Sequence, residues 1–365
     1  MGGRAKCSCK ICKHHQRVSG RPENIKQQNQ NNKKEGMELL RSLKIFLLVT
    51  MIFSLTACSN ATKKPTPKAT IPKEPTSKAQ EKTGIKVDKE PVITLYINET
   101  GKKSSIAMEK YLEGVVAAEM DVKWPPEALA AQAILARTFT MKKISQGGVK
   151  AKGTDASTSV EEFQAYAPEK INNAVKAAVH NTRGKVVLYN NQYINAWFYS
   201  CSGGKTASSA AEGLEYKQEK APYIKSVSDP GLAAAPPNIK EWRTEISLSE
   251  VKNAVQKAKG TDPGSIKSAS IAAKGPSGIA TKLKFNNATV SAAAFRLAVG
   301  SERMRSASLK EFAIKGDKLL ITGKGFGHGV GMSQWGAKAL ADQGMKADQI
   351  INHYYKDIKI KKIWK

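Results

Sequence analysis

The stretch YLEGVVAAEMDVKWPPEALAAQAILAR, residues 111–137, predicts two helices separated by a sharp break. Apolar residues recur at helical spacing between 112 and 120, which gives the first helix an apolar face. Pro125 ends that pattern, and Pro126 suits the first turn of the next helix. The second helix is predicted over 128–141 and should end before Gly147. It is apolar nearly all round, which is typical of a buried helix.

Three polar residues in this stretch are candidate site residues. Apart from two threonines, only Gln132 and Arg137 are polar between 128 and 141. Glu119 ends the first helix, where the negative end of the helix dipole and apolar neighbours both raise the pKa of a carboxyl. Such a shift moves it toward the range of a general acid. The structural alternative is a buried ion pair between Glu119 and Arg137.

Composition and charge define the broad class of the protein. The chain has 365 residues, of which 41% are hydrophobic, so it can form a core of one large domain or two ordinary ones. Its formal net charge of +28 favours polyanions such as nucleic acid, anionic lipid or anionic wall polymers. No zinc finger, aromatic RNA-binding motif or homeodomain pattern is present, so nucleic acid is not a predicted partner.

The N-terminal part indicates export. Residues 37–57 have basic residues followed by an apolar core at 45–55, too short to span a bilayer. The core ends in LTAC, residues 55–58, which resembles the lipobox of bacterial lipoproteins and implies lipidation of Cys58. Residues 1–36 precede this signal and are interpreted as an over-extended N-terminus. Residues 58–91 are rich in Lys, Pro and Thr, which predicts an extended tether.

The region after residue 91 mixes helices with short strands. Strands are predicted at Val92–Ile97 and Lys185–Tyr189. The second of these turns at Asn190-Asn191 into a strand over 193–199. Further helices are predicted at 168–181 and Leu248–Lys259.

A glycine-rich stretch, GKGFGHGVGMSQWGAKALADQG, occupies residues 323–344. Glycine at every second position from 323 to 331 would expose the backbone of a strand-like segment to a ligand. The spacing matches neither a P-loop nor a dinucleotide fingerprint. Ser333 is predicted to cap a helix, so that His328, Gln334 and Trp335 form a set suited to a sugar. The alternative is that the glycines only allow tight packing.

A second polar loop is SCSGGKT, residues 200–206. Ser202 and Lys205 could form the polar rim of a site. Cys201 could be read as a nucleophile, but no pattern of Cys with His and Asn supports this. A small, semi-buried thiol is the preferred interpretation.

With these stretches, residues 92–355 resemble the stage II sporulation protein D and amidase-enhancer family of bacterial cell-wall proteins. The resemblance rests on residues 111–138, on SCSGGKT, and on the glycine-rich stretch with INHYY at 351–355. It implies a two-lobed α+β fold. We assign residues 92–365 to this domain, with an insert or second lobe at about 235–310.

The resemblance implies a peptidoglycan lytic transglycosylase. The family's catalytic glutamate falls on Glu119 and its conserved arginine on Arg137. We expect Gln132 and Arg137 to position Glu119, and the glycan to be bound by Ser202, Lys205, His328 and Gln334. The expected partners are glycan strands and the membrane, with the protein lipid-anchored at its outer face.

Two departures from the family bear on its role. Sporulation members often carry a histidine just before the SCSGGKT-like loop, where this chain has Phe198-Tyr199. Some members bind zinc around that loop, but this chain offers only Cys201, so no metal and no cofactor are predicted. The rival function is a non-catalytic wall-glycan-binding protein that stimulates a partner amidase.

Replacing Cys58 tests the predicted anchor. We expect wild-type protein to begin at a lipidated Cys58, because the lipobox places the cleavage there. Cys58→Ser should abolish membrane association in cell fractionation. A protein that retains residues before Met37 and fractionates as soluble would contradict this prediction.

Overall fold

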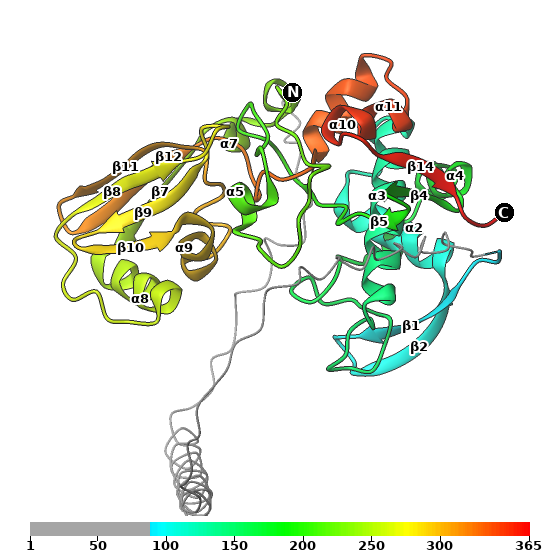
Figure 1. The fold of residues 1–365 in the computed structure, drawn as a ribbon, viewed down its shortest axis with the longest axis horizontal. Helices are drawn as coiled ribbons and strands as arrows, with labels where there is room; N and C mark the ends of the chain where they lie inside the picture. The colour runs from blue at the N-terminus through cyan, green and yellow to red at the C-terminus, as the bar shows by residue number, and fades with distance from the viewer. Residues whose placement is uncertain (1–87) are drawn as a thin grey trace, which may run out of the picture. The chain divides into compact units, whose positions relative to one another are not determined.

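A computed structural model describes residues 88–365. The expectations for residues 1–57, for Cys58 and for most of the tether lie outside these residues. Within the described residues, no helix has the length and apolar character needed to cross a membrane. The elements form several small sheets with helices between them, so the α+β prediction is confirmed (Figure 1). The two-lobed arrangement stays a prediction.

The first sheet has the strand order β2-β1-β3 and adjoins the two predicted helices. Strand β1 (Val92–Ile97) has the predicted bounds and pairs antiparallel with β2 (Lys102–Ala107) and parallel with β3 (Ala156–Ser157). Helix α2 (Met108–Glu119) and helix α3 (Pro126–Ser145) follow β2, with Pro126 in the first turn of α3 as predicted. Most of α3 is buried, which its sequence also predicted.

The second sheet, β14-β4-β5, confirms one predicted strand and corrects another. A 3₁₀ turn, η2 (Pro168–Lys170), and helix α4 (Asn173–Asn181) precede β4 (Lys185–Tyr189). The turn at Asn190-Asn191 has positive φ at both residues, as a two-residue hairpin turn requires. Strand β5 is only Gln192–Tyr193, so the strand predicted over 193–199 is wrong. The chain pairs again as β6 (Phe198–Tyr199), parallel to β13 (Met332–Ser333).

A separate cluster of buried apolar side chains forms between Trp242 and Ile321. Helix α8 (Leu248–Lys259) is confirmed and is capped by Ser247 together with Glu250. The sheets here are β11-β12-β7 and β10-β9-β8. Their elements are β7 (Trp242–Ser247), β8 (Ala269–Lys274), β9 (Ala280–Phe285), β10 (Ala288–Ser291), α9 (Ala292–Val299), β11 (Leu309–Lys315) and β12 (Lys318–Gly323).

The remaining elements are short helices and one strand. They are α5 (Ala210–Leu214), α6 (Gly231–Ala234), α7 (Pro237–Lys240), α10 (Gln334–Asp342), α11 (Ala347–Tyr354) and β14 (Lys359–Lys362). Ser333 caps α10 as predicted, since its side chain accepts a hydrogen bond from the Gly336 N–H at 3.1 Å.

The glycine-rich segment is a tightly packed loop, which corrects the strand-like prediction. Gly325, Gly327, Gly329 and Gly331 all have positive φ, a backbone conformation that residues other than glycine rarely adopt. A Cβ on Gly325 would lie 2.6 Å from the Cys201 carbonyl oxygen, and one on Gly327 would lie 2.7 Å from Tyr199 Cβ. The glycines therefore let this segment pack against the chain around residues 199–201, as the packing alternative proposed.

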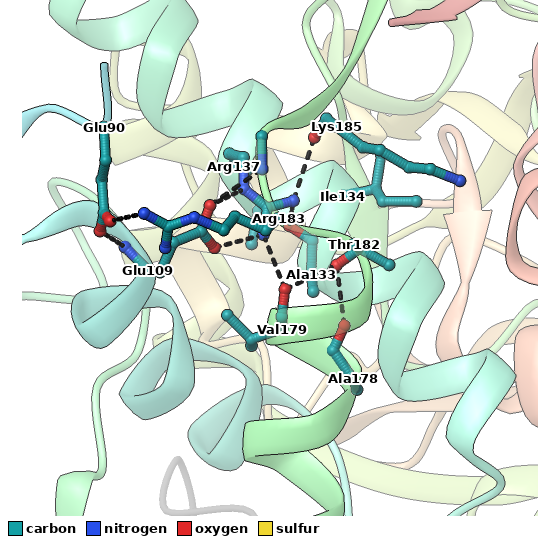
Figure 2. A network of polar contacts seen from close by, with 12 residues as sticks. Glu90, Glu109, Ala133, Ile134, Arg137, Ala178, Val179, Thr182, Arg183 and Lys185 are labelled. Carbon is teal, nitrogen blue, oxygen red and sulfur yellow. Dashed lines mark hydrogen bonds and ion pairs between the residues drawn. The ribbon is translucent and has the colours of Figure 1, made fainter. Parts of the chain in front are cut away.

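Arg137 pairs with Glu109 and not with Glu119, which corrects both the expected positioning role of Arg137 and the alternative of a buried pair with Glu119 (Figure 2). Its Nη2 lies 2.5 Å from Glu109 Oε2 and its Nε 3.1 Å from Oε1. Both side chains are buried, so Arg137 is not exposed to a substrate. Glu109 and Glu119 are ten residues apart on one helix, or about 15 Å at 1.5 Å per residue, so one arginine cannot pair with both.

Further hydrogen bonds join this ion pair to the ends of the described chain. Glu109 Oε1 also accepts from the Gly184 N–H at 3.0 Å and from the Trp364 indole N–H at 2.9 Å. The Glu109 N–H donates to Glu90, which in turn binds Arg183. The network therefore connects α2, α3 and the C-terminal segment.

Glu109→Gln should destabilise the domain strongly. Loss of one partner leaves the Arg137 charge buried and unpaired, which costs about 3–5 kcal/mol. Chemical denaturation of the soluble domain measures this. Glu113→Gln is the matched control on the same helix, because Glu113 pairs with the mostly exposed Lys110 and should change stability by less than about 1 kcal/mol. Equal stability of the two variants would contradict the prediction.

Candidate active site

Glu119 lies where three segments of the chain meet. It is the last residue of α2. Its Oε1 accepts a hydrogen bond from the Ala165 N–H at 3.2 Å, and its Oε2 accepts one from Gln334 Nε2 at 3.4 Å. Gln334 is 215 residues further along the chain, at the start of α10. Two of the predicted site residues, Glu119 and Gln334, are therefore in direct contact.

The environment of Glu119 favours its protonated form. Burial raises the pKa of Glu119 to about 7, while the hydrogen bonds from Ala165 and Gln334 lower it. Among residues 88–365, no cation is one of the groups that shift this pKa. The direction agrees with the sequence-based expectation, and burial is the dominant cause. A carboxyl of this kind is partly protonated near neutral pH, so it can both donate and accept a proton.

Aromatic rings lie beside the segments that contact Glu119. Trp335, next to Gln334, packs edge-on against Trp124 with ring centroids 4.7 Å apart. Tyr166, next to Ala165, stacks on Tyr111 at 5.6 Å. Both tryptophans are only partly buried. Such rings supply apolar faces suited to sugars.

Asp229 and Tyr354 connect this site to the SCSGGKT loop, and the sequence analysis did not identify either role. Ser333 Oγ accepts from the Ser202 N–H at 3.3 Å and donates to Asp229 Oδ1 at 3.3 Å. Tyr354 OH donates to Asp229 Oδ2 at 2.7 Å. Tyr354 lies within the INHYY motif, but Asp229 is a single acidic residue in an irregular segment, so no local pattern marks it.

His328 is held in its neutral form by the fold. Its Nδ1 accepts from the Val330 N–H at 3.1 Å, and its Nε2 lies 3.1 Å from the Phe198 carbonyl, to which it must donate. Burial, together with the nearby Arg296 charge, lowers the pKa of His328 to about 3. Both ring nitrogens are engaged within the protein, which argues against the predicted hydrogen bonding of His328 to a glycan.

The other predicted site residues are placed differently from one another. Gln132 is fully buried, and among residues 88–365 neither its amide oxygen nor its amide nitrogen has a hydrogen-bond partner. Ser202 is buried and its Oγ accepts from the Gly204 N–H at 3.2 Å. Lys205 is exposed. Gln132 therefore makes no hydrogen bond to Glu119, which argues against its expected positioning role. Contact of Ser202 and Lys205 with substrate stays a prediction.

The surroundings of Cys201 do not fit a zinc ion. The thiol is buried and lies 3.4 Å from the Ser202 carbonyl, to which it donates. Burial raises the pKa of Cys201 well above its ordinary value, which opposes formation of the thiolate that metal binding and nucleophilic attack need. Within residues 88–365, no three potential metal-ligating side chains are grouped closely enough to hold an ion.

His328 should remain neutral at pH 5. As the pH falls, His328 of the unfolded chain binds a proton near pH 6.5, whereas His328 of the folded chain binds one only near pH 3. The stabilisation from the neutral ring is therefore complete above pH 6.5 and is lost as the pH falls toward 3. Nitrogen-15 NMR of the histidine rings measures the tautomer. A protonated His328 ring at pH 5 would contradict this placement.

Comparisons with known proteins identify the family of the chain. A family model described as stage II sporulation protein matches residues 96–189, which include Glu119. Stage II sporulation protein D of Bacillus subtilis is 32% identical over 316 residues, covering 80% of this chain and 84% of that protein. The amidase enhancer of Bacillus subtilis is 31% identical over 292 residues, covering 67% of this chain but only 39% of that protein. The chain belongs to the stage II sporulation protein D family.

Proposed function

We propose that the protein is a peptidoglycan lytic transglycosylase with Glu119 as its acid and base. The observation that supports this most is a carboxyl with a pKa of about 7 and no ion-pair partner contributing to it. Membership of the family supports a role at the bacterial cell wall. The substrate would be the β-1,4 bond between N-acetylmuramic acid and N-acetylglucosamine, in strands that have lost their stem peptides.

In the first step, protonated Glu119 gives its proton to the glycosidic oxygen. The bond between that oxygen and C1 of the muramyl residue breaks, and N-acetylglucosamine leaves with a free 4-hydroxyl. Glu119 is then a carboxylate. The Gln334 amide N–H donates to this ionised form, and such a charge-assisted hydrogen bond is stronger than its neutral counterpart.

In the second step, the Glu119 carboxylate removes the proton of the muramyl 6-hydroxyl. The oxygen of that hydroxyl bonds to C1 and closes a 1,6-anhydro ring, so no water is consumed. Glu119 is again protonated and ready for another cycle. One carboxyl acts in both steps, which differs from glycosidases that use two carboxylates.

The proposed setting is the outer face of the membrane. Lipid on Cys58 would anchor the chain, and residues 58–91 would separate the domain from the bilayer. The thirty residues at 58–87, extended at about 3.1 Å each, would reach roughly 90 Å. The anchored domain could therefore sample wall strands across that distance.

A second candidate function is stimulation of an amidase without glycan cleavage. The similarity to a protein named amidase enhancer favours it. In this case the chain would bind wall glycan and a cell-wall amidase, and the proton on Glu119 would have no role. Replacement of Glu119 separates the two functions.

Glu119→Gln should abolish most of the cleavage activity. The amide keeps the size of the side chain but cannot pass on a proton, so turnover should fall by about 10²–10⁴-fold. Mass spectrometry of anhydro ends released from peptide-stripped glycan measures it. In the wild type, the rate should also fall as the pH rises above about 7, because the acid form is lost.

Glu113→Gln is the activity control, since Glu113 shares α2 and binds Lys110 at the surface. Glu109→Gln is unsuitable as a control because it leaves Arg137 unpaired. Release of anhydro ends by Glu119→Gln at the wild-type rate would overturn the transglycosylase proposal. Retained stimulation of an amidase by the same variant would favour the enhancer function.

A further inference from the structure

The hydroxyl of Ser333 forms three hydrogen bonds, which join three segments of the chain. It accepts from the Gly336 N–H at 3.1 Å, which caps α10, and from the Ser202 N–H at 3.3 Å. It donates to Asp229 Oδ1 at 3.3 Å. A hydroxyl has one donor and two acceptor sites, so Ser333 Oγ is fully engaged.

The Asp229 carboxylate fixes the direction of that hydroxyl. Asp229 is buried, and besides Ser333 it accepts from the Gly231 N–H at 2.9 Å and from Tyr354 OH at 2.7 Å. Both acceptor sites of Ser333 Oγ are filled by N–H groups, so its hydroxyl hydrogen is donated to Asp229. Tyr354 belongs to α11, and the arrangement therefore fastens the first turn of α10 to α11 and to the SCSGGKT loop.

The residue that follows Ser333 is the one that contacts Glu119. Gln334 is nearly buried, and its 3.4 Å bond to Glu119 is near the outer limit for a hydrogen bond. A small movement of the helix start would break it. The Trp335 N–H, bonded to the Ser200 carbonyl at 3.0 Å, is a second restraint on the same turn.

We propose that Ser333 is a positioning residue for Glu119, acting through Gln334, with Asp229 and Tyr354 holding its hydroxyl in place. The importance of this for catalysis rests on the proposed function of Glu119. The alternative is an ordinary helix cap that contributes only to stability. Ser291 provides the comparison, because it caps α9 in the same way by accepting from the Ala294 N–H.

The test measures the pKa of Glu119 in the free domain by carbon-13 NMR of its carboxyl group. Gln334→Met removes the donor while burial remains, so the pKa of Glu119 should rise above about 7, by roughly 0.5 unit. Ser333→Ala should raise it in the same direction. In the double variant, Ser333→Ala should add little to the shift from Gln334→Met, because both act through one contact.

Ser291→Ala is the matched control and should leave the pKa of Glu119 unchanged. The titratable side chain that interacts with Glu119 is Tyr111, with Tyr166 stacked on it. The pKa of each of these phenols is raised, so neither ionises in the pH range of this titration. If Ser333→Ala does not fold, Tyr354→Phe removes one bond to Asp229 and should give a smaller shift of the same sign.

The proposal is overturned if Ser333→Ala, or Tyr354→Phe where it replaces that variant, leaves the pKa of Glu119 unchanged or lowers it. A shift fully additive with that of Gln334→Met would also overturn it, because Ser333 would then act by another route. The measurement needs no substrate. If Glu119→Gln remains active, the transglycosylase proposal fails, and the coupling between Ser333 and Glu119 is still decided by NMR.

Discussion

The buried pair between Arg137 and Glu109 is the constraint on which the site depends. It fixes α2 against α3 and, through Gly184 and Trp364, binds the C-terminal segment to the same point. Because Arg137 is neutralised at the first turn of α2, its charge is not available at the other end of the helix. Glu119 is partly buried and, among residues 88–365, has no cation shifting its pKa, so loss of hydration is what raises that pKa. The pair between Arg137 and Glu109 thus affects the pKa of Glu119 without contacting it, because it keeps the Arg137 charge away from Glu119.

A second constraint brings distant parts of the chain to Glu119. The start of α10 reaches it only because the glycine-rich loop passes close to residues 199–201, where side chains at Gly325 or Gly327 would collide. Ser333 then ends the loop and begins the helix. The glycine-rich loop, the Ser333 cap and Gln334, which contacts Glu119, follow one another in the sequence. The position of Gln334 therefore depends on backbone conformation as much as on packing.

Local signals in the sequence were sufficient for several elements and for the direction in which the pKa of Glu119 is shifted. The bounds of β1, β4 and α8, the break at Pro125, the Ser333 cap and the direction of the Glu119 pKa shift all follow from patterns a few residues long. Tertiary pairing could not be obtained in this way. Glu109 and Glu119 lie on the same helix, and only the packing of α2 on α3 decides which one meets Arg137. His328 was likewise predicted to bind glycan, but the fold provides hydrogen-bond partners for both of its ring nitrogens.

The energetics of Glu119 argue for function over stability. Raising its pKa from 4.5 to about 7 corresponds to roughly 3 kcal/mol lost from folding once the carboxyl is ionised. The unfolded chain releases this proton first, so the loss grows as the pH rises from about 4.5 to about 7 and persists above it. The net charge of +28 favours the ionised form of Glu119. Solvent and salt screen distant charges, so this effect on the pKa is smaller than that of local burial. A residue that only supported the fold would gain by having a cation beside it. A partly buried carboxyl with no cation shifting its pKa among residues 88–365, at the meeting point of three segments, has the properties that proton transfer requires.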